Sequence, residues 1–470
     1  MLATAPGRGA VGSLCRGMRL GWRTPVAERM GAWRGAFTDP LYRTAYSLMA
    51  NTVLTAVLGV AFWLAAARLF SRNEVGQDSA LISAMMGISV FCQLNLNNAL
   101  TRFLPVTRRY TAGIVGLAYG ASALVSLAVA VGFVVLVPRW SSQLRFLAHD
   151  HVLAAAFCIV LPLWAVFTLQ DSALTALRRA PWVAVENTVF GVLKLAALPV
   201  LLALGTGHGI FLGWTAPLVL IVAVVNLLLF ARVVPVHLRA APDRAANADA
   251  IERPALARFL ALDYLAWALS NGFAYLLPLL VVAMLGSRTN ASFYIAYTVS
   301  ASLNMLFLNA ATSLTVEGAM AEQQLAELTR RLVRKMLPLL LAGVIVLTLA
   351  APLVLLPFGG SYARQGATVL RLLAVATLFR SVVILYSAVA RVRGSGGRIL
   401  VANVALVALL VVATVAFGER YGLTGIGVGW LGAHVVVAVA LLPSLSRLLR
   451  QSAAPAFSAA GTPRPSRSAS

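Results

Sequence analysis

Long apolar runs, separated by short polar segments, dominate the chain from about residue 45 to residue 446. Most runs reach about 20 residues, which is the length that a helix needs to cross a bilayer. Helices are expected because lipid offers no hydrogen-bond partner to an open backbone. Twelve spans are predicted, over residues 45–68, 79–101, 112–137, 151–177, 182–204, 209–231, 256–285, 291–316, 335–357, 365–390, 398–417 and 422–446.

The composition agrees with this pattern. Of the 470 residues, 60% are hydrophobic and 11% are charged, whereas soluble domains are about 45–50% apolar and about a quarter charged. Twelve spans use most of the apolar residues and leave too little sequence for a folded soluble domain. We therefore predict an all-α polytopic membrane protein with twelve transmembrane helices.

The basic residues indicate how the chain is oriented. Of the 38 Lys and Arg residues, 28 lie in segments on one side of the predicted spans and 7 on the other. Because cytoplasmic loops are rich in Lys and Arg, both termini are expected in the cytoplasm. The net charge of +23 is assigned to these loops, and no nucleic-acid partner is expected. Residues 1–44 and 447–470 are predicted to be disordered cytoplasmic tails.

The two halves of the chain are related by an offset of 216 residues. The matching pairs are Ser71-Arg72 with Ser287-Arg288, Asn187 with Asn403, and Gly209-Ile210-x-x-Gly213-Trp214 with Gly425-Ile426-x-x-Gly429-Trp430. A shift of six helices preserves orientation, so the sequence predicts two parallel six-helix repeats around a central cavity. The predicted N-lobe covers residues 45–231, the cytoplasmic linker 232–255 and the C-lobe 256–446.

Polar side chains inside spans mark candidate substrate-binding residues, because they are costly in lipid. The densest group closes the second span and comprises Gln93, Asn95, Asn97, Asn98 and Arg102. At the offset of 216, an equivalent strip with helical spacing comprises Asn309, Ser313 and Glu317. Two such strips that face each other are typical of a water-filled cavity, and interhelical hydrogen bonding is the alternative explanation.

Isolated charges within the spans supply further candidates. Arg380, deep in the tenth span, can attract an anionic head group. Asp171, Glu186 and Asp263 are candidate ion-coupling residues. For Asp171 and Glu186, pairing with a basic residue is the alternative. The three cysteines form no paired motif and no Walker loop is present, so no metal site, cofactor or enzymatic activity is expected.

Three stretches resemble the polysaccharide-biosynthesis flippases of the multidrug/oligosaccharidyl-lipid/polysaccharide exporter superfamily. They are residues 63–105, residues 275–319 and the basic amphipathic stretch that follows, 316–335. The resemblance implies two lobes around a cavity that opens alternately to each side. It also implies a lipid-diphosphate-linked oligosaccharide as substrate, flipped from the inner to the outer leaflet of a bacterial plasma membrane. Membrane lipids and glycan-assembly enzymes are the partners that it suggests.

Two other functions stay open beside that of a flippase. One is a cation-coupled multidrug exporter, and the other is a non-transporting membrane scaffold of a glycan-assembly complex. The charge of the cavity discriminates among the three. A basic cavity, with Arg102 and Arg380 in it, favours a diphosphate lipid. An acidic cavity favours organic cations, and a dry interface between the halves favours the scaffold.

Overall fold

The computed structural model describes residues 40–104, 110–140, 142–239, 253–320 and 322–453, and these residues contain helices but no strand. The first half comprises α3 (Pro40–Leu69), α4 (Arg72–Cys92), α5 (Leu96–Phe103), α6 (Thr111–Trp140), α7 (Phe146–His149), α8 (His151–Ala176), α9 (Ala180–Ala203), α10 (Gly209–Leu228) and α11 (Val234–Arg239). The second half comprises α12 (Arg253–Leu285), α13 (Ser287–Met320), α14 (Leu325–Leu349), α15 (Ala351–Leu355), α16 (Gly360–Val392) and α17 (Gly396–Ala453). Short single turns join them, namely η1 (Ser142–Leu144), η2 (Leu229–Val233), η4 (Glu322–Gln324) and η5 (Leu356–Phe358).

Every predicted span coincides with helical structure. Within the described residues, ten helices are long and apolar enough to cross a membrane. The last of these, α17, contains two predicted spans, because the chain continues through a kink at Gly422, where φ is 59°. The first predicted span lies in α3, whose described apolar part is the shorter segment Leu54–Leu69. The chain is therefore an all-helical, multi-pass membrane protein.

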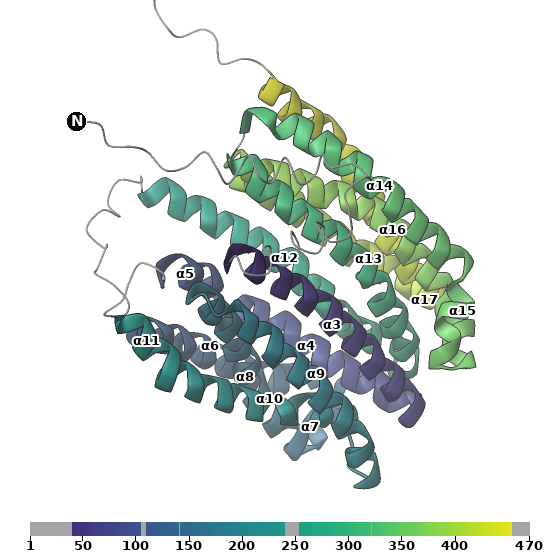
Figure 1. Ribbon diagram of the computed structural model, residues 1–470. Helices are drawn as coiled ribbons and strands as arrows, with labels where there is room; N and C mark the ends of the chain where they lie inside the picture. The colour runs from purple at the N-terminus through teal and green to yellow at the C-terminus, as the bar shows by residue number, and fades with distance from the viewer. Residues whose placement is uncertain (1–39, 105–109, 141, 240–252, 321, 454–470) are drawn as a thin grey trace, which may run out of the picture.

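The helices form two groups, joined through α4 (Figure 1). In the first half α3 packs against α9, and α8 packs against α6. In the second half α16 packs against both α13 and α17, and α12 packs against α17. Contact between the halves is made largely by α4, which lies along α12 and α13.

Helices α4 and α13 cross very closely at one end of the molecule. A Cβ atom at Gly76 would lie 1.8 Å from the carbonyl oxygen of Ser287. The amide of Asn290 also donates a hydrogen bond of 2.8 Å to the carbonyl of Gly76. This is the end at which α3 joins α4, and we call it the outer end, following the predicted orientation.

Two predicted boundaries are wrong. The segment 79–101 is not one helix, because the chain turns between α4 and α5, and the helix also begins earlier, at Arg72. The amphipathic pattern of residues 316–335 also predicts one surface helix, but the structure divides this stretch between two helices. Its first residues end α13 and its last begin α14, which continues into the ninth predicted span. The first boundary differs because the chain turns between α4 and α5, and the second because α14 continues without a break into the next span. Hydrophobic periodicity does not detect either feature.

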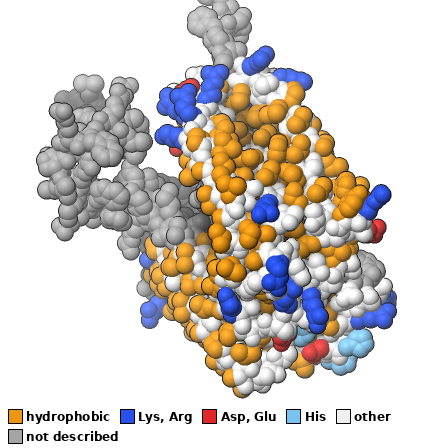
Figure 2. All heavy atoms as spheres, turned by 90° about the vertical axis from the view of Figure 1, so that its right-hand side faces the viewer, with side chains coloured by type: hydrophobic (Ala, Val, Ile, Leu, Met, Phe, Trp, Pro, Cys, Tyr) orange, Lys and Arg blue, Asp and Glu red, His pale blue; other side chains and the backbone are white. Residues whose placement is uncertain are grey.

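The predicted linker 232–255 begins as helix. A π-helical turn, Leu229–Val233, continues α10 into α11, which ends at Arg239. Residues 240–252 and most of both predicted tails lie outside the described residues. Hydrophobic side chains cover the middle of the face in Figure 2, and charged side chains gather mainly towards its two ends. This distribution is typical of a surface that faces lipid.

Candidate functional site

A polar pocket of about 270 Å³ lies inside the second half of the chain. Its walls come from α12, α13, α16 and α17. Large side chains on α12 and α13 form its exposed rim, among them Trp267 (41% exposed) and Met305 (53% exposed). The pocket therefore opens between the two helices that α4 contacts.

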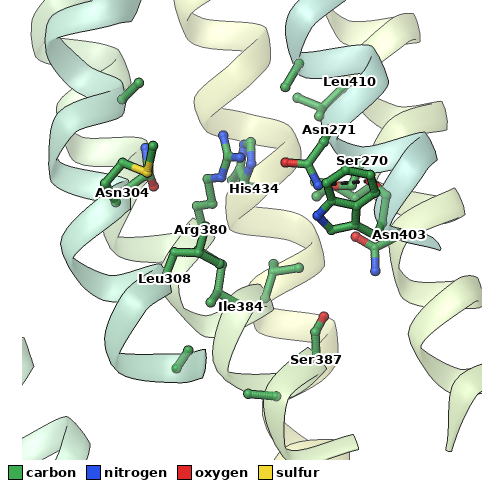
Figure 3. Close-up of a pocket in the computed structure, with 18 of the residues that line it drawn as sticks. Ser270, Asn271, Asn304, Leu308, Arg380, Ile384, Ser387, Asn403, Leu410 and His434 are labelled. Atoms are coloured by element: carbon green, nitrogen blue, oxygen red, sulfur yellow. Dashed lines mark hydrogen bonds between the residues drawn. The ribbon is translucent and has the colours of Figure 1, made fainter. Parts of the chain in front are cut away.

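Arg380 of α16 is the central charge of this pocket. Its side chain extends from α16 towards His434 of α17 (Figure 3), and it interacts electrostatically with Tyr297 of α13. Among the described residues, no carboxylate forms an ion pair with Arg380. His434 is buried, and its Nδ1 lies 2.8 Å from the carbonyl oxygen of Trp430. Arg380, one of the predicted cavity residues, thus lies in the wall of this pocket.

A second arginine, Arg391, lies three turns further along the same face of α16. Its Nη2 is 3.0 Å from Oδ1 of Asp263, and its Nε also donates to that carboxylate. Asp263, a candidate coupling residue, is therefore held in an ion pair with Arg391, which the sequence did not predict. Since no Asp or Glu side chain lines the pocket, its walls are net positive.

Amide and aromatic side chains complete the pocket. Asn271, Asn304 and Asn403 reach it from three different helices. The side-chain amide oxygen of Asn304 is buried and has no hydrogen-bond partner within the described structure. The amide nitrogens of the other two donate to backbone carbonyls, at 2.9 Å for Asn271 and 2.8 Å for Asn403. The side-chain oxygens of Asn271 and Asn403 are not engaged by these two bonds and can accept hydrogen bonds from a polar ligand in the pocket.

The first predicted polar strip lies at the turn between α4 and α5. Leu94 and Asn95 have φ values of 51° and 62° there, a left-handed conformation that asparagine tolerates better than most residues. Asn97 donates to the buried Gln93 at 2.5 Å, and Asn98 donates to Asn95 at 2.7 Å. These amides bond to one another across the turn, and none of them lines the polar pocket.

The remaining predicted cavity residues are placed as follows. Arg102 belongs to α5, but its side chain lies outside the described residues. Asn309, Ser313 and Glu317 share an exposed face of α13, where the Ser313 hydroxyl donates to Glu317 at 3.3 Å. This face adjoins the one that lines the pocket, so of the predicted cavity residues only Arg380 lies in its wall.

The other two candidate coupling residues meet in the first half. Asp171 of α8 and Glu186 of α9 are in hydrogen-bonding contact. Asn187 donates to Asp171 at 3.3 Å, and Gln170 donates to Glu186 at 3.2 Å. The other oxygen of each carboxyl group is buried and accepts no hydrogen bond from an amide or hydroxyl group, and the Tyr119 hydroxyl is buried without a partner within the described structure. The fold thus brings Asp171 and Glu186, which were predicted as separate candidates, into one polar cluster.

Most pocket residues were missed at the level of sequence. Asn271, Asn304 and Asn403 were not selected, although each is a single polar residue within a predicted span. Asn403 carried a usable signal, because the offset of 216 pairs it with Asn187. The sequence alone does not show that single asparagines on three helices converge on one pocket. The dense polar group at 93–102 was selected instead, and it lies at a turn.

Comparison with known proteins identifies the fold. No protein-family model matches the sequence, and no curated protein does so either. Among solved structures, the chain is similar to an inward-facing multidrug resistance MATE family transporter of the MOP superfamily, with a TM-score of 0.60, 17% identity, and 87% of this chain and 98% of that chain covered. It is similar to an outward-facing MATE transporter with a TM-score of 0.54, 14% identity, and 89% and 97% covered.

The lipid II flippase MurJ, in an inward closed conformation, is also similar, with a TM-score of 0.61 and 11% identity. That match covers 87% of this chain and 90% of MurJ. At these identities the likeness concerns the fold. The chain therefore has the fold shared by MATE transporters of the MOP superfamily and the lipid II flippase MurJ.

Proposed function

We propose that this protein is a flippase for a lipid-diphosphate-linked oligosaccharide. It would carry the substrate from the inner to the outer leaflet of a bacterial plasma membrane by alternating access, with both termini in the cytoplasm. Two observations support the proposal: the likeness of the fold to that of a lipid II flippase, and the chemistry of the polar pocket. The glycan-assembly enzymes that supply and use such a lipid are the proposed partners.

The observation that carries the proposal is the positive charge of the pocket. Arg391 is neutralised by Asp263, whereas Arg380 has no carboxylate partner in the described structure. A guanidinium in a partly dehydrated cavity is suited to bind a diphosphate, because its planar donors match phosphate oxygens in pairs. An exporter of organic cations needs the opposite charge at this point.

The rest of the pocket suits a sugar. Asn271 and Asn403 line the pocket with side-chain oxygens that can accept hydrogen bonds from hydroxyl groups. Trp267 and Trp430 provide broad apolar ring faces in the same wall. A few fixed polar groups among aromatic walls are typical of ligand sites that recognise orientation as well as shape.

The arrangement of the halves supports an inward-facing state. At the outer end, Arg68 donates to the carbonyl of Pro357, and Trp63 packs against Tyr294 with ring centroids 4.5 Å apart. These contacts tie the outer part of α3 to the second half. The higher TM-score with the inward-facing than with the outward-facing MATE structure agrees with this state.

The central test replaces Arg380 with Ala. The loss of its charge is expected to lower flipping of a fluorescent undecaprenyl-diphosphate-linked sugar in proteoliposomes at least about tenfold, because hydrogen bonds to charged groups contribute about 1.5–3 kcal/mol. Arg380→Lys should retain part of the activity. Arg371→Ala is the matched control, since Arg371 is an exposed residue of the same helix outside the pocket. Unchanged flipping by Arg380→Ala would contradict the proposal.

Asp171 and Glu186 are proposed to couple transport to protons. Two carboxyl groups in hydrogen-bonding contact can hold one proton between them. In the same proteoliposomes, an imposed pH gradient is expected to stimulate the wild type but not Glu186→Gln. Glu419→Gln, at an exposed carboxyl group of the second half, is the control. Equal stimulation of both variants would exclude the pair from coupling.

The alternative function is a cation-coupled multidrug exporter, which the MATE likeness favours. The acidic pair at Asp171 and Glu186 is the feature of this chain that would serve it. Efflux of ethidium from cells that express the protein, with no effect of Arg380→Ala, would support this alternative. A non-transporting scaffold would show neither activity.

A further inference from the structure

A second, smaller pocket of about 130 Å³ lies inside the first half, among α3, α8, α9 and α10. Four of its nine lining residues are aromatic, with Trp164, Phe190 and Trp214 among them. Lys194 of α9 extends into it and is only 6% exposed. A lysine is seldom buried so deeply unless it is paired, so its surroundings require a physical explanation.

The Lys194 ammonium is held by ring faces. Its Nζ lies 3.6 Å from the ring centroid of Trp214, and 5.2 Å from the centroids of both Phe62 and Phe190. Among the described carboxylates, none forms an ion pair with it. Several aromatic faces around one cation form the arrangement with which proteins bind quaternary ammonium groups.

This pocket is the repeat counterpart of the polar pocket in the second half. Adding 216 to the residue numbers places eight of its nine lining residues on lining residues of that pocket. Asn187 falls on Asn403, and Trp214 falls on Trp430. The correspondence shows that the two halves fold around equivalent cavities.

The two pockets differ in charge. Arg380 corresponds to Trp164 in the first half, and Lys194 corresponds to Leu410 in the second. Asn187, in the wall of the smaller pocket, donates to Asp171, which contacts Glu186. Without Lys194, the first half would present aromatic faces next to two carboxyl groups, and that chemistry favours a cation.

We propose that the pocket of the first half has the chemistry of a binding site for an organic cation of the quaternary ammonium class. In the protein itself, the ammonium group of Lys194 fills this site and keeps such cations out. The side chain places its own ammonium where the head group of the ligand would lie. Lys194 is thereby a specificity-determining residue, which excludes organic cations from this pocket. This inference does not require the proposed flipping of a lipid-linked glycan.

Removal of the tethered cation should open the site. In Lys194→Ala, the cage formed by Phe62, Phe190 and Trp214 stays in place, and the volume of the lysine side chain is added to the pocket. Purified full-length protein in detergent is titrated with tetraethylammonium by isothermal calorimetry. The Ala variant is expected to bind at least about tenfold more tightly than the wild type, as a desolvated cation–π contact allows.

Two controls separate the cage from a general loosening of the structure. Lys194→Met fills the pocket with an uncharged chain of similar length and should bind no more tightly than the wild type. The double variant Lys194→Ala/Trp214→Ala removes the closest ring and should lose the gained affinity. Equal binding by the Ala and Met variants, or by the single and double variants, would overturn the proposal.

A second route covers the case in which Lys194→Ala does not fold. Lys194→Cys is purified, titrated with tetraethylammonium, and then modified with 2-aminoethyl methanethiosulfonate, which restores a tethered ammonium. The unmodified variant should bind, and the modified one should not. Wild-type protein treated in the same way controls for the native cysteines at positions 15, 92 and 158. Folded Ala or Cys variants that bind no better than the wild type would exclude the site, whatever the outcome of the flipping assay.

Discussion

At the scale of single residues, a buried carboxylate ties the interface helix to the rest of the first half. Asp78 of α4 is fully buried and accepts hydrogen bonds of 3.0 Å from the backbone N–H groups of Ile210 and Phe211 at the start of α10. An anion at this position also suits the helix dipole. His208, in the preceding turn, lies 2.6 Å from the same carboxylate. Asp78 was overlooked as a candidate because the second predicted span begins one residue after it.

The pair of Asp78 and His208 leads to a pH prediction. Burial lowers the pKa of His208, but the hydrogen bond and charge of Asp78, with smaller effects of Asp150 and Glu74, raise it more, so it lies above its ordinary value of 6.5. The charged histidine therefore stabilises the fold fully below pH 6.5, and this contribution is lost as the pH rises through the raised pKa.

We expect the unfolding temperature of the wild type in detergent to fall by a few degrees above the ordinary pKa of His208, as followed by intrinsic fluorescence. His208→Gln should lack this pH-dependent step. His149→Gln, at an exposed histidine of the same outer end, should keep it. A step of the same size in His208→Gln would show that another group causes it.

At the scale of elements, a close crossing of two helices decides whether a glycine can be replaced by a larger residue. At Gly76, α4 approaches the backbone of α13 so closely that a Cβ atom would overlap the Ser287 carbonyl. Small residues permit such contacts between membrane helices. A methyl group added at Gly132 of α6 would meet no neighbouring atom within 4 Å among the described residues. A glycine in a span therefore does not by itself reveal a crossing.

Gly76→Ala is expected to destabilise the protein by about 1–3 kcal/mol, because the helices must separate to admit the methyl group. Gly132→Ala should be neutral or slightly stabilising, since alanine favours helix by about 1 kcal/mol over glycine. Thermal unfolding in detergent measures both. Equal unfolding temperatures for the two variants would argue against the close crossing of α4 and α13.

At the scale of the whole molecule, an arginine at the outer end joins the two halves. Arg72 of α4 donates from one nitrogen to the carbonyl of Arg288, the hydroxyl of Ser292 and the side-chain oxygen of Gln365, at 2.8, 2.7 and 2.5 Å. Its guanidinium also lies 5.4 Å from the ring centroid of Tyr362. A single arginine of the first half thus engages α13 and α16 of the second.

Removal of this contact should shift the protein towards an outward-open state. A loss of about 2 kcal/mol changes the ratio of two conformations roughly 30-fold. Spin labels at Gly207→Cys and Arg364→Cys, on exposed outer positions of the two halves, are expected to report longer distances in Arg72→Ala. Arg139→Ala, an exposed residue at the end of α6, is the control. An unchanged distance distribution would exclude Arg72 as a lock.

By itself, the sequence determined the class of fold, the positions of the spans and the register between the halves. It could do so because hydrophobic length and composition report directly on transfer into lipid, and because a repeat is visible along the chain. Arg380 was found in the same way, since an isolated charge within a span is costly. The turn at Leu94 and Asn95 was not found, because one left-handed turn leaves the apolar pattern intact.

Only the tertiary structure decided which side chains meet. It paired Asp263 with Arg391, joined Asp171 to Glu186, and gathered Asn271, Asn304 and Asn403 around Arg380. It also placed Lys194 among three aromatic rings. These contacts join residues on different helices, and the rotation and crossing of packed helices are set by the fit of whole surfaces, which no local pattern of residues records.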